Sequence, residues 1–434
     1  MLLVILLLAV YTTSSTFINQ NDSRFLYEGR WLHSADSSEA DWPCAAVRFA
    51  INVTKETNET IDLRWEGIRS RMNVSVSEGI LDFSHIYRSD VVHGSSVEIP
   101  FQKPSTYSLS LANVPIGIHT VRFRKLTTSC PYGSGIGDDF LSSSHVKFYG
   151  VELPSSIIMP PPPPLPPRRK IEFIGASDTA GYCVDGEASF NFIQYGFEGW
   201  EYENCDLANT GNLGQMFQAD ISIPSISGIG LTQNANAAKQ WIMGKKTARD
   251  YWNFTLQSSS KHFWDFSTWR PDLVYISLGG NDYNHQNGHV PSNETFTEAY
   301  EHFMLRVLNT YVTRKKNYPS HHLFEQFTYK NNDIRYGNTT TKVLSVCGQG
   351  SPIEATQDPD NNRCRPCPHV ESAVNAFQSK YTDLKTQVGY VFVPCDGTVV
   401  KGKNDIGCMG HKNRVGQAEV TQYLASYIRD FMGW

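Results

Sequence analysis

The first 153 residues contain short segments in which apolar and polar positions alternate, as they do in strands that bury one face. Clusters of Gly, Asn, Pro or Ser separate these segments at intervals of roughly ten residues, and no long helical period interrupts them. This spacing is typical of an all-β sandwich. We therefore predict a jelly-roll-like sandwich domain over residues 20–153, with strands at 45–53, 61–65, 72–76, 97–101, 107–112, 118–124 and 146–153.

The pattern changes after residue 170, where the strand-like runs are apolar throughout. Such runs indicate a parallel sheet that is covered on both faces. Segments with helical periodicity alternate with them, and the last has one apolar face, made of Val420, Tyr423, Leu424, Tyr427, Ile428 and Phe431. We expect a three-layer α/β/α domain over residues 170–434, with strands at 171–174, 273–278, 343–347 and 390–394 and helices at Thr297–Val312, Val370–Leu384 and Val415–Met432.

A proline-rich segment separates the two regions. The stretch "MPPPPPLPPRRK" at 159–170 contains seven prolines, which favour an extended polyproline conformation and exclude the interior of a sheet. We interpret residues 154–169 as a semi-rigid linker. The alternative is a docking site for a proline-binding module.

Length and composition agree with this division. A chain of 434 residues suggests two domains, and a composition of 40% hydrophobic and 19% charged residues with a net charge of -5 predicts a soluble globular protein that does not bind nucleic acid. Residues 1–16 hold an apolar run too short to cross a bilayer, followed by small polar residues. We interpret them as a secretory signal peptide, although a basic start is missing; the alternative is a buried strand. No later stretch is apolar enough to span a membrane, so no membrane association is expected after cleavage.

Asn-X-Ser/Thr sequons and cysteines also indicate export. Sequons are glycosylated only in the secretory pathway, and they occur at Asn21, Asn52, Asn58, Asn73, Asn253, Asn293 and Asn338. The chain has nine cysteines, most of which would pair in an oxidising compartment, with one left over. We therefore expect a secreted, extracellular, N-glycosylated protein with disulfide bonds.

Spacing supports only local guesses about the disulfides. Cys44 and Cys130 are the only cysteines before the linker and are predicted to pair, and Cys183 with Cys205 is a second local guess. The pairing of the other five cannot be assigned: Cys347, Cys364, Cys367, Cys395 and Cys408. The Cys-Arg-Pro-Cys stretch at 364–367 is half a zinc site or a redox pair in the alternative interpretation, but no second cysteine pair at metal spacing accompanies it.

Candidate catalytic residues follow the predicted parallel strands, whose carboxyl ends meet at one edge of the sheet. Ser177 follows the first strand, Asn281 follows the second, and His411 comes after the fourth, before the last helix. An imidazole activates a serine hydroxyl by taking its proton, and amide hydrogen-bond donors at the oxyanion stabilise the tetrahedral intermediate. A glycine amide at 228 or 230 lies between the first two blocks. Each signal alone is weak, because Gly-X-Ser at a strand end is a turn more often than a nucleophile, but the order Ser, Gly, Asn, His is much more specific.

These four blocks resemble the SGNH (GDSL-type) hydrolase superfamily, and nearly the whole chain after residue 16 resembles carbohydrate esterase family 2. The resemblance rests on "GRW" at 29–31, "YSLSLANVPIGIHTVRFRKLT" at 107–127, "IEFIGASDTAGY", "SGIGLTQN", "LGGND", "CPHVESAV" and "GHKNRVGQ". It implies a β-sandwich joined to an SGNH-like α/β/α domain. It also implies a secreted esterase, without metal or cofactor, that removes O-acetyl groups from poly- or oligosaccharides, with preference for primary, 6-O-type esters on gluco- or manno-configured sugars.

The resemblance assigns the site residue by residue. Ser177 would be the nucleophile through an acyl-enzyme and His411 the general base and acid. The Ser177 amide, Gly228 and Asn281 would form the oxyanion hole, and Gly228 is preferred to Gly230 because it follows Ser227 in an Ile-Ser-Gly pattern. The competing histidine, His369, is interpreted as structural.

Two departures from the family pattern concern the site. Ala176 stands where the superfamily usually has Asp before the serine, and its effect should be limited to a looser turn. Cys408 stands where an Asp three residues before the histidine usually orients the ring. Asp405 is a possible substitute, which would make a triad; we prefer a Ser-His dyad in which a backbone carbonyl orients His411, as in some relatives.

Two further points stay open at this level. Trp200, Trp264, Trp269 and Tyr283 can stack on sugar rings, although core packing is the preferred interpretation for each, and residues 348–369 are expected to lie over the rim of the site. The second functional hypothesis is a catalytically inactive glycan-binding surface protein that keeps the esterase fold, favoured by Ala176 and Cys408. The survival of Ser177, Asn281 and His411 at their expected places favours the enzyme.

Overall fold

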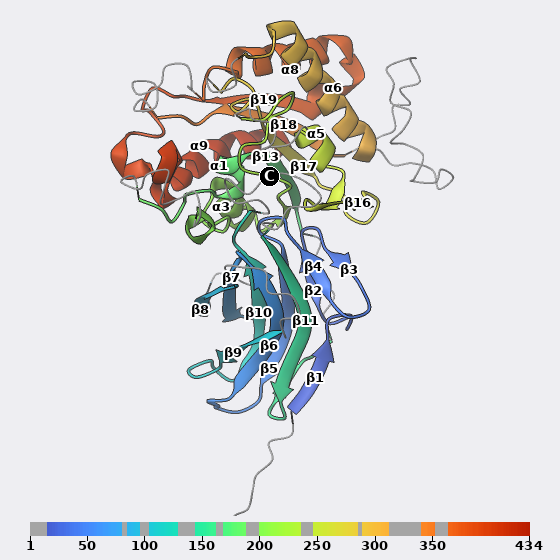
Figure 1. Cartoon of the computed structure of the whole chain (residues 1–434), viewed down its shortest axis with the longest axis vertical. Helices are drawn as coiled ribbons and strands as arrows, with labels where there is room; N and C mark the ends of the chain where they lie inside the picture. The colour runs from blue at the N-terminus through green and yellow to red at the C-terminus, as the bar shows by residue number, and fades with distance from the viewer. Residues whose placement is uncertain are drawn as a thin grey trace, which may run out of the picture.

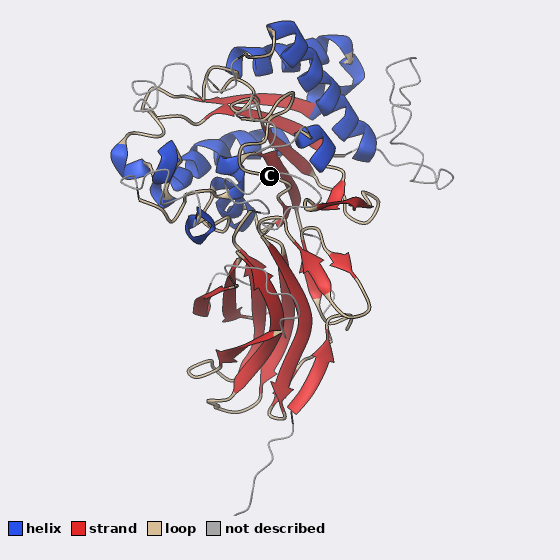
Figure 2. Ribbon diagram, in the orientation of Figure 1, coloured by secondary structure: helices blue, strands red, loops and turns tan. Residues whose placement is uncertain are grey.

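The computed structural model describes residues 15–79, 85–95, 104–128, 144–161, 168–187, 199–235, 246–284, 289–311, 340–351 and 363–434. Figures 1 and 2 show an elongated molecule with antiparallel strands at one end and a parallel sheet with helices at the other. Several predictions lie outside the described residues: most of the signal peptide, strand 97–101, Cys130, Asn338, linker residues 162–167 and the central part of segment 348–369.

Two antiparallel sheets form the N-terminal part of the molecule. The first has the order β3-β4-β11-β6-β9 with β1 added beside β11, and consists of β1 (Ser15–Asn19), β3 (Leu32–His33), β4 (Ser38–Ala40), β6 (Thr60–Ile68), β9 (Ser105–Ser110) and β11 (His145–Pro154). The second has the order β12-β5-β10-β7-β8 with β2 beside β5, and consists of β2 (Leu26–Glu28), β5 (Ala46–Val53), β7 (Arg71–Glu78), β8 (Ile86–His93), β10 (Gly117–Lys125) and β12 (Ile157–Ile158). Six of the seven predicted strands are therefore confirmed. The jelly-roll topology stays a prediction.

The two antiparallel sheets bury one apolar core between them. Alternate residues of each strand point inward, as Val47, Phe49 and Ile51 do on β5, and all three are buried. Trp65 of the first sheet meets Phe123 of the second edge to face, with ring centroids 5.5 Å apart. The period-two pattern therefore predicted the strands that enclose this core.

The parallel sheet has the order β14-β13-β17-β18-β19, and every pairing in it is parallel. Its strands are β13 (Lys170–Gly175), β14 (Asp220–Ser222), β17 (Leu273–Ser277), β18 (Lys342–Gly348) and β19 (Val388–Val393), so the four predicted strands are confirmed. A separate hairpin joins β15 (Phe254–Leu256) to β16 (Ser259–Phe263). Sequence patterns missed β8, which is largely exposed, and the short strands β1, β2, β3, β4, β12, β14, β15 and β16, each of which has five residues or fewer.

Helices cover both faces of the parallel sheet. On one face α6 (Asn293–Tyr311) and α8 (Cys367–Lys380) share a core with Ile174, Val274 and Ile276, and on the other α3 (Asn209–Met216) and α9 (Arg414–Met432) pack on Phe173 and Tyr275. The shorter helices are α1 (Ser177–Ala180), α5 (Ala248–Tyr251), η1 (Gly199–Tyr202), η6 (Thr382–Gln387), η7 (Lys403–Asp405) and η8 (Cys408–Gly410). The three-layer arrangement and the three predicted helices are thus present, except that the predicted second helix ends earlier and continues as η6. None of the described helices is long and apolar enough to cross a membrane.

One side chain of the predicted apolar face of α9 faces solvent. Val420, Leu424 and Ile428 are buried as expected, whereas Tyr427 is 46% exposed. Its hydroxyl lies 3.3 Å from that of Tyr423, which donates to Phe392 O. An aromatic ring with a polar tip can thus remain at the edge of a helix stripe.

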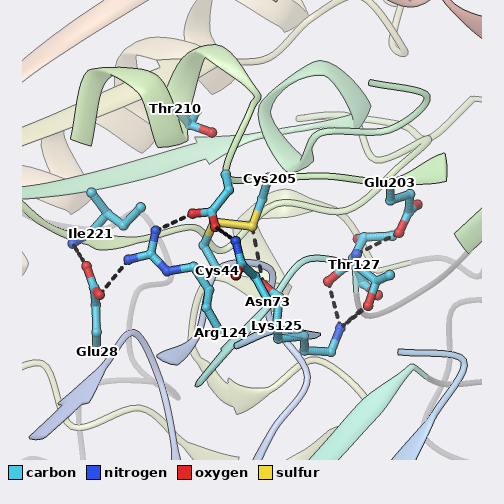
Figure 3. Close-up of a disulfide and its surroundings, with 12 residues drawn as sticks. Glu28, Cys44, Asn73, Arg124, Lys125, Thr127, Glu203, Cys205, Thr210 and Ile221 are labelled. Carbon is cyan, nitrogen blue, oxygen red and sulfur yellow. Dashed lines mark hydrogen bonds and ion pairs between the residues drawn. A yellow bond between two sulfur atoms is a disulfide. The ribbon is translucent and has the colours of Figure 1, made fainter. Parts of the chain in front are cut away.

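Buried charges join the N-terminal sheets to the α/β part. Arg30, from the Gly-Arg-Trp motif, lies 3.0 Å from Glu172 on β13, and both side chains are fully buried. In a second cluster Arg124 lies 2.6 Å from Glu28, a pair that Figure 3 shows, and 2.6 Å from the carboxylate of Asp206. We call Arg124, Glu28 and Asp206 the Arg124 cluster. Burial opposes ionisation of Glu28, but Arg124 and Arg48 hold its pKa below the usual range. Buried charges of this kind are stable only when each has its partner.

Four disulfides correct both guessed pairings. Cys44 pairs with Cys205, which lies beside the Arg124 cluster in Figure 3, and Cys183 pairs with Cys408. The remaining pairs are Cys347–Cys367 and Cys364–Cys395, so the Cys-Arg-Pro-Cys stretch is disulfide-bonded but not to itself. Cys44 lies at the interface, where its Cα is 5.8 Å from that of Cys205. The guesses failed because pairing depends on distance in the fold and not on nearness in sequence.

We expect Arg30→Ala to lower the thermal midpoint strongly, because it leaves Glu172 buried without its positive partner. The expected loss is about 3–5 kcal/mol. Arg64→Ala is the control, since Arg64 pairs with Glu152 at the surface, where such pairs contribute about 0–1 kcal/mol. Calorimetry of both variants would measure the difference, and equal midpoints would contradict a stabilising role for the buried pair.

We also expect Glu203→Gln to change the stability of the folded protein by an amount that depends on pH. Burial raises the pKa of Glu203 to about 8, against the Thr128 amide, which donates to Oε2 at 2.7 Å. The unfolded carboxyl ionises near 4.5, so folding takes up a proton between about pH 4.5 and 8, and stability from this group falls as pH rises through that window. Glutamine does not titrate, so the variant should gain stability relative to wild type by up to on the order of 1 kcal/mol per pH unit.

Thermal midpoints of wild type and Glu203→Gln between about pH 5 and 8 test this expectation. Glu78→Gln, at an exposed position at the end of β7, is the control and should follow wild type at every pH. A constant difference between Glu203→Gln and wild type would show that Glu203 is ionised in the folded protein.

Candidate active site

Ser177 lies where a buried strand turns into a helix. Strand β13 ends at Gly175 and α1 begins at Ser177, so the amide of Ser177 is among those that the first turn of a helix leaves unpaired. Gly175 is required here, because a Cβ at this position would lie 2.0 Å from Thr179 Oγ1. The strand-to-turn interpretation of "IEFIGASDT" is therefore confirmed.

His411 reaches Ser177 from the far end of the chain. It follows η8, two residues before Asn413, the N-cap of α9, and its Nε2 lies 2.8 Å from Ser177 Oγ. The ring also meets that of Tyr182 edge to face, with centroids 4.8 Å apart. The expected contact is present, whereas His369 stacks on Tyr283 with centroids 5.4 Å apart.

A pocket of about 280 Å³ opens beside these two side chains. Strand ends and loops of the parallel sheet line it, as expected for the carboxyl edge of such a sheet. Among the described residues, the lining includes Ser177, Asp178, Ile229, Ser277, Asn281, Asn284, Gln349, Arg363, Pro366 and His411. Residues 349, 363 and 366 belong to the segment that was expected at the rim of the site. A small-molecule group thus has direct access to Ser177 Oγ.

Asn281 and the 228–230 loop lie on one side of the pocket. Asn281 Nδ2 donates to Ile229 O at 2.7 Å, which orients the side-chain amide. Gly230 donates its amide to Asn234 Oδ1 at 3.0 Å, and Gly228 adopts a left-handed conformation with φ of 82°. Ile229, and not Gly228, is among the residues that line the pocket.

Asp282 holds this loop against the strand end that carries Asn281. Its buried carboxylate accepts backbone amides of Leu231 at 2.9 Å, Thr232 at 2.6 Å and Gln233 at 3.1 Å. Burial raises the pKa of Asp282, against these hydrogen bonds. The final Asp of "LGGND" therefore positions the loop of "SGIGLTQN".

Asp178 connects the two segments that carry Ser177 and His411. Its carboxylate lies 2.9 Å from Lys412 Nζ and 2.8 Å from Arg363 Nε, and Arg363 Nη1 donates to Gly410 O at 3.0 Å. We call Asp178, Arg363 and Lys412 the Asp178 cluster. Both neighbours of His411 in sequence, Gly410 and Lys412, are thus held by the residue after Ser177 or by its partner.

Burial and charge set the protonation of the Asp178 cluster. Burial would raise the pKa of Asp178, but Arg363, Lys412 and His411 hold it well below the usual range. Burial lowers the pKa of Lys412 to about 8, against the opposing effect of Asp178. The carboxylate is therefore ionised at neutral pH and provides a negative charge near His411.

Asp405, the possible orienter of His411, and Cys408, at the position of the usual orienting Asp, each have a partner other than His411. The Asp405 carboxylate accepts the Lys401 amide at 2.6 Å, and its carbonyl accepts the Asn413 amide at 3.0 Å. Cys408 forms the disulfide with Cys183, which joins the turn after α1 to the loop of His411. A covalent bond thus occupies the position where the family pattern has a carboxylate. Across the described ranges, no cluster of three or more His, Cys, Asp or Glu side chains has the arrangement of a metal site.

The chain is similar to known esterases. No protein-family model matches the chain. The cellulase/esterase CelE of Acetivibrio thermocellus is 30% identical over 186 residues, which are 42% of this chain and 20% of that protein. An acetylxylan esterase / glucomannan deacetylase of Cellvibrio japonicus is 25% identical over 279 residues, 62% of this chain and 67% of the relative.

Solved structures share the fold over nearly the whole chain. A family two carbohydrate esterase from Cellvibrio japonicus superimposes with a TM-score of 0.67 at 15% identity, covering 97% of this chain and 99% of the other. One from Clostridium thermocellum, solved in complex with cellohexaose, has a TM-score of 0.65 at 21% identity and covers 94% and 99%. The chain resembles carbohydrate esterase family 2. These similarities support a carboxylic ester hydrolase, although the match spans only a fifth of CelE.

None of the four aromatic residues considered for sugar stacking belongs to the lining of the described pocket. Trp200 is buried beside His93, and Tyr283 is buried between Phe296 and His369. The Trp264 ring lies under the Arg30 guanidinium, 5.3 Å from its centroid. Core packing is thus confirmed for Trp200 and Tyr283, while Trp269 is partly exposed.

Sequence reasoning did not single out Asp178, Arg363, Lys412 or Asp282. Lys412 lies inside the quoted "GHKNRVGQ", and Asp178 directly follows Ser177, but nothing in a single sequence shows that the two pair. Asp282 lies inside the quoted "LGGND", directly after Asn281. The signal that could have found Asp178, Asp282 and Lys412 is a charged residue next to each candidate catalytic residue, whereas Arg363 has no such neighbour in sequence.

We expect Asp178→Asn to lower kcat of ester hydrolysis by roughly 10- to 100-fold with a smaller change in KM, because His411 loses the contacts that hold its loop near Ser177. Hydrolysis of p-nitrophenyl acetate measures both constants. Asp396→Asn, in the exposed loop after β19, is the matched control and should behave as wild type.

Lys412→Gln provides an independent variant of the same cluster and should also lower kcat. Near-ultraviolet circular dichroism of each variant separates a loss of fold from a displaced histidine. Full activity in a folded Asp178→Asn protein would show that the Asp178 cluster does not position the site.

Proposed function

We propose that this protein is a secreted carbohydrate esterase that removes O-acetyl groups from poly- or oligosaccharides, with Ser177 as nucleophile. The observation that carries the proposal is the 2.8 Å contact between Ser177 Oγ and His411 Nε2 at the mouth of a pocket that Asn281 also lines. A nucleophile, a base and an amide donor at one site are the parts that acyl transfer requires.

In the first half-reaction, Ser177 Oγ attacks the carbonyl carbon of the ester while His411 Nε2 takes the hydroxyl proton. The carbonyl oxygen becomes an oxyanion, for which the amides of Ser177 and Gly228 and the side chain of Asn281 are the proposed donors. Asn281 Nδ2 has two hydrogens, and the bond of one to Ile229 O sets the direction of the other. His411 then returns the proton to the sugar oxygen, and the C–O bond of the ester breaks.

In the second half-reaction, water attacks the acetyl-Ser177 intermediate. His411 takes a proton from this water and returns it to Ser177 Oγ as the bond to the acetyl carbon breaks, so acetate leaves and the enzyme is regenerated. Each donor of the oxyanion hole is worth about 2.7–4 kcal/mol in such reactions. The mechanism requires no metal and no cofactor.

We propose a Ser-His dyad rather than a triad. The position of the usual orienting Asp is Cys408, which is in a disulfide, and the Asp405 carboxylate is bonded to the Lys401 amide. The Asp178 cluster and the Cys183–Cys408 disulfide would instead keep the imidazole in place. The negative charge of Asp178 would also stabilise the imidazolium that forms during each step.

Substrate, location and domain organisation form part of the proposal. The Cellvibrio japonicus relative is named as an acetylxylan esterase and glucomannan deacetylase, so acetylated hemicelluloses are the first candidates. We further propose that residues 1–16 direct secretion and that a sandwich domain over 20–153 is joined through 154–169 to a catalytic domain over 170–434. The ion pairs between the two parts would make the sandwich a fixed frame for the site.

We expect Ser177→Ala to abolish release of p-nitrophenol from p-nitrophenyl acetate and of acetate from acetylated glucomannan and xylan. The expected loss is at least about 1,000-fold, because no other group supplies the nucleophile. Ser277→Ala, which changes another serine of the same pocket, is the matched control and should retain most of the activity. Equal inactivity of wild type and Ser177→Ala on all three substrates would favour the glycan-binding alternative.

A further inference from the structure

An asparagine occupies the middle of an exposed apolar row on the second antiparallel sheet. Asn52 of β5 is paired directly with Ile118 of β10 on one side and with Ile158 of β12 on the other. Residues that are directly opposite in an antiparallel pair project from the same face. The three side chains therefore form one row, with Asn52 in the centre.

This row lies on the outer face of the sheet. The neighbours of Asn52 along β5, Ile51 and Val53, point into the core and are fully buried. Ile118 is 42% exposed and Ile158 is 54% exposed. We call Ile118 and Ile158 the isoleucine shelf. Strand pairing with β5 fixes both aliphatic side chains on the solvent-exposed face of the sheet. Exposure of such side chains to water is unfavourable unless another group covers them.

Asn52 begins the sequon Asn-Val-Thr, and asparagine is otherwise depleted in strands. We propose that Asn52 carries an N-linked glycan whose first sugar rings cover the isoleucine shelf. The C–H faces of the rings would lie on the two isoleucines, and the hydroxyl groups would face water. This modification does not depend on the esterase chemistry, but it rests on the proposed secretion of the chain.

The transfer needs a lipid-linked oligosaccharide diphosphate as donor. The Nδ2 atom of Asn52 forms a bond to the anomeric carbon of the first sugar and loses one proton. The bond from that carbon to the diphosphate oxygen breaks, and the lipid diphosphate leaves with the electron pair. No oxidant or reductant takes part.

The asparagines of two other sequons, Asn73 and Asn253, use their side-chain amides in hydrogen bonds within the folded protein. Asn73 donates to Asp206 at 3.1 Å and accepts from Ser89 at 3.0 Å, at the interface between the N-terminal sheets and the α/β part. Asn253 is buried, with its amide bonded to the Arg249 and Asp250 carbonyls. A glycan on either nitrogen would displace these partners, so we expect both to be unmodified in folded protein.

The first test maps occupancy on the full chain, expressed with its own N-terminus in a eukaryotic secretory host. Enzymatic deglycosylation in heavy-oxygen water converts each occupied asparagine to labelled aspartate, which peptide mass spectrometry then locates. We expect label at Asn52 and none at Asn73 or Asn253. Absence of label at Asn52, in secreted protein or because the chain is not secreted at all, overturns the proposal.

The second test addresses the isoleucine shelf. Asn52→Gln should give several-fold more fluorescence from a dye that binds apolar surface and more self-association than wild type. Asn58→Gln, which removes an exposed sequon outside any strand, is the matched control and should match wild type. Adding Ile118→Thr and Ile158→Thr to Asn52→Gln should abolish the increase.

An increase that survives the two threonine substitutions, or an equal increase in Asn58→Gln, would show that the glycan does not cover the isoleucine shelf. Hydrolysis of p-nitrophenyl acetate, measured in parallel, should be unchanged in all these variants, because the row lies on the antiparallel sheet and not at the pocket. Failure of the esterase assay would therefore leave the glycan result interpretable.

Discussion

The geometry of the candidate site depends on the ion pairs that the carboxylate of Asp178 makes with Lys412 and Arg363. Ser177 and His411 are separated by 234 positions, yet their side chains must meet within hydrogen-bonding distance. Asp178 binds Lys412 on one side of His411, and through Arg363 it fixes Gly410 on the other. A buried carboxylate between two cations is costly to break, because each charge would be left without its partner. The Asp178 cluster therefore holds the His411 loop in position beside Ser177.

The N-terminal part of the molecule contacts β13, the strand that ends just before Ser177. Glu172 of this strand forms an ion pair with Arg30. Its carboxylate also accepts hydrogen bonds from the indole of Trp252 and the hydroxyl of Tyr311. The strand that presents the nucleophile is thus held by groups from both parts of the molecule. The Cys44–Cys205 disulfide fixes the interface covalently beside the Arg124 cluster. Arg30 of the Gly-Arg-Trp motif thus contacts the strand that ends just before Ser177, although the motif lies far from Ser177 in sequence.

Much of the fold could be predicted because strand and helix patterns depend on which residues are buried. Alternation located β5, β6, β7, β9, β10 and β11, and continuous apolar runs located β13, β17, β18 and β19 of the parallel sheet. The missed strands are either largely exposed, as β8 is, or at most five residues long, so they leave no alternation that a sequence pattern can detect. Tyr427 failed as a core residue because an aromatic ring with a hydroxyl remains stable at a partly exposed position.

The sequence by itself determined that Ser177, Asn281 and His411 follow strands of one parallel sheet, and the carboxyl ends of such strands meet at one edge. It did not determine what holds these residues in place. The pairing of Cys183 with Cys408, of Asp178 with Lys412 and of Arg30 with Glu172 joins positions that are far apart in the chain. Disulfides and buried ion pairs form between groups that the folded backbone brings within a few ångströms, and local sequence patterns carry no information on that distance.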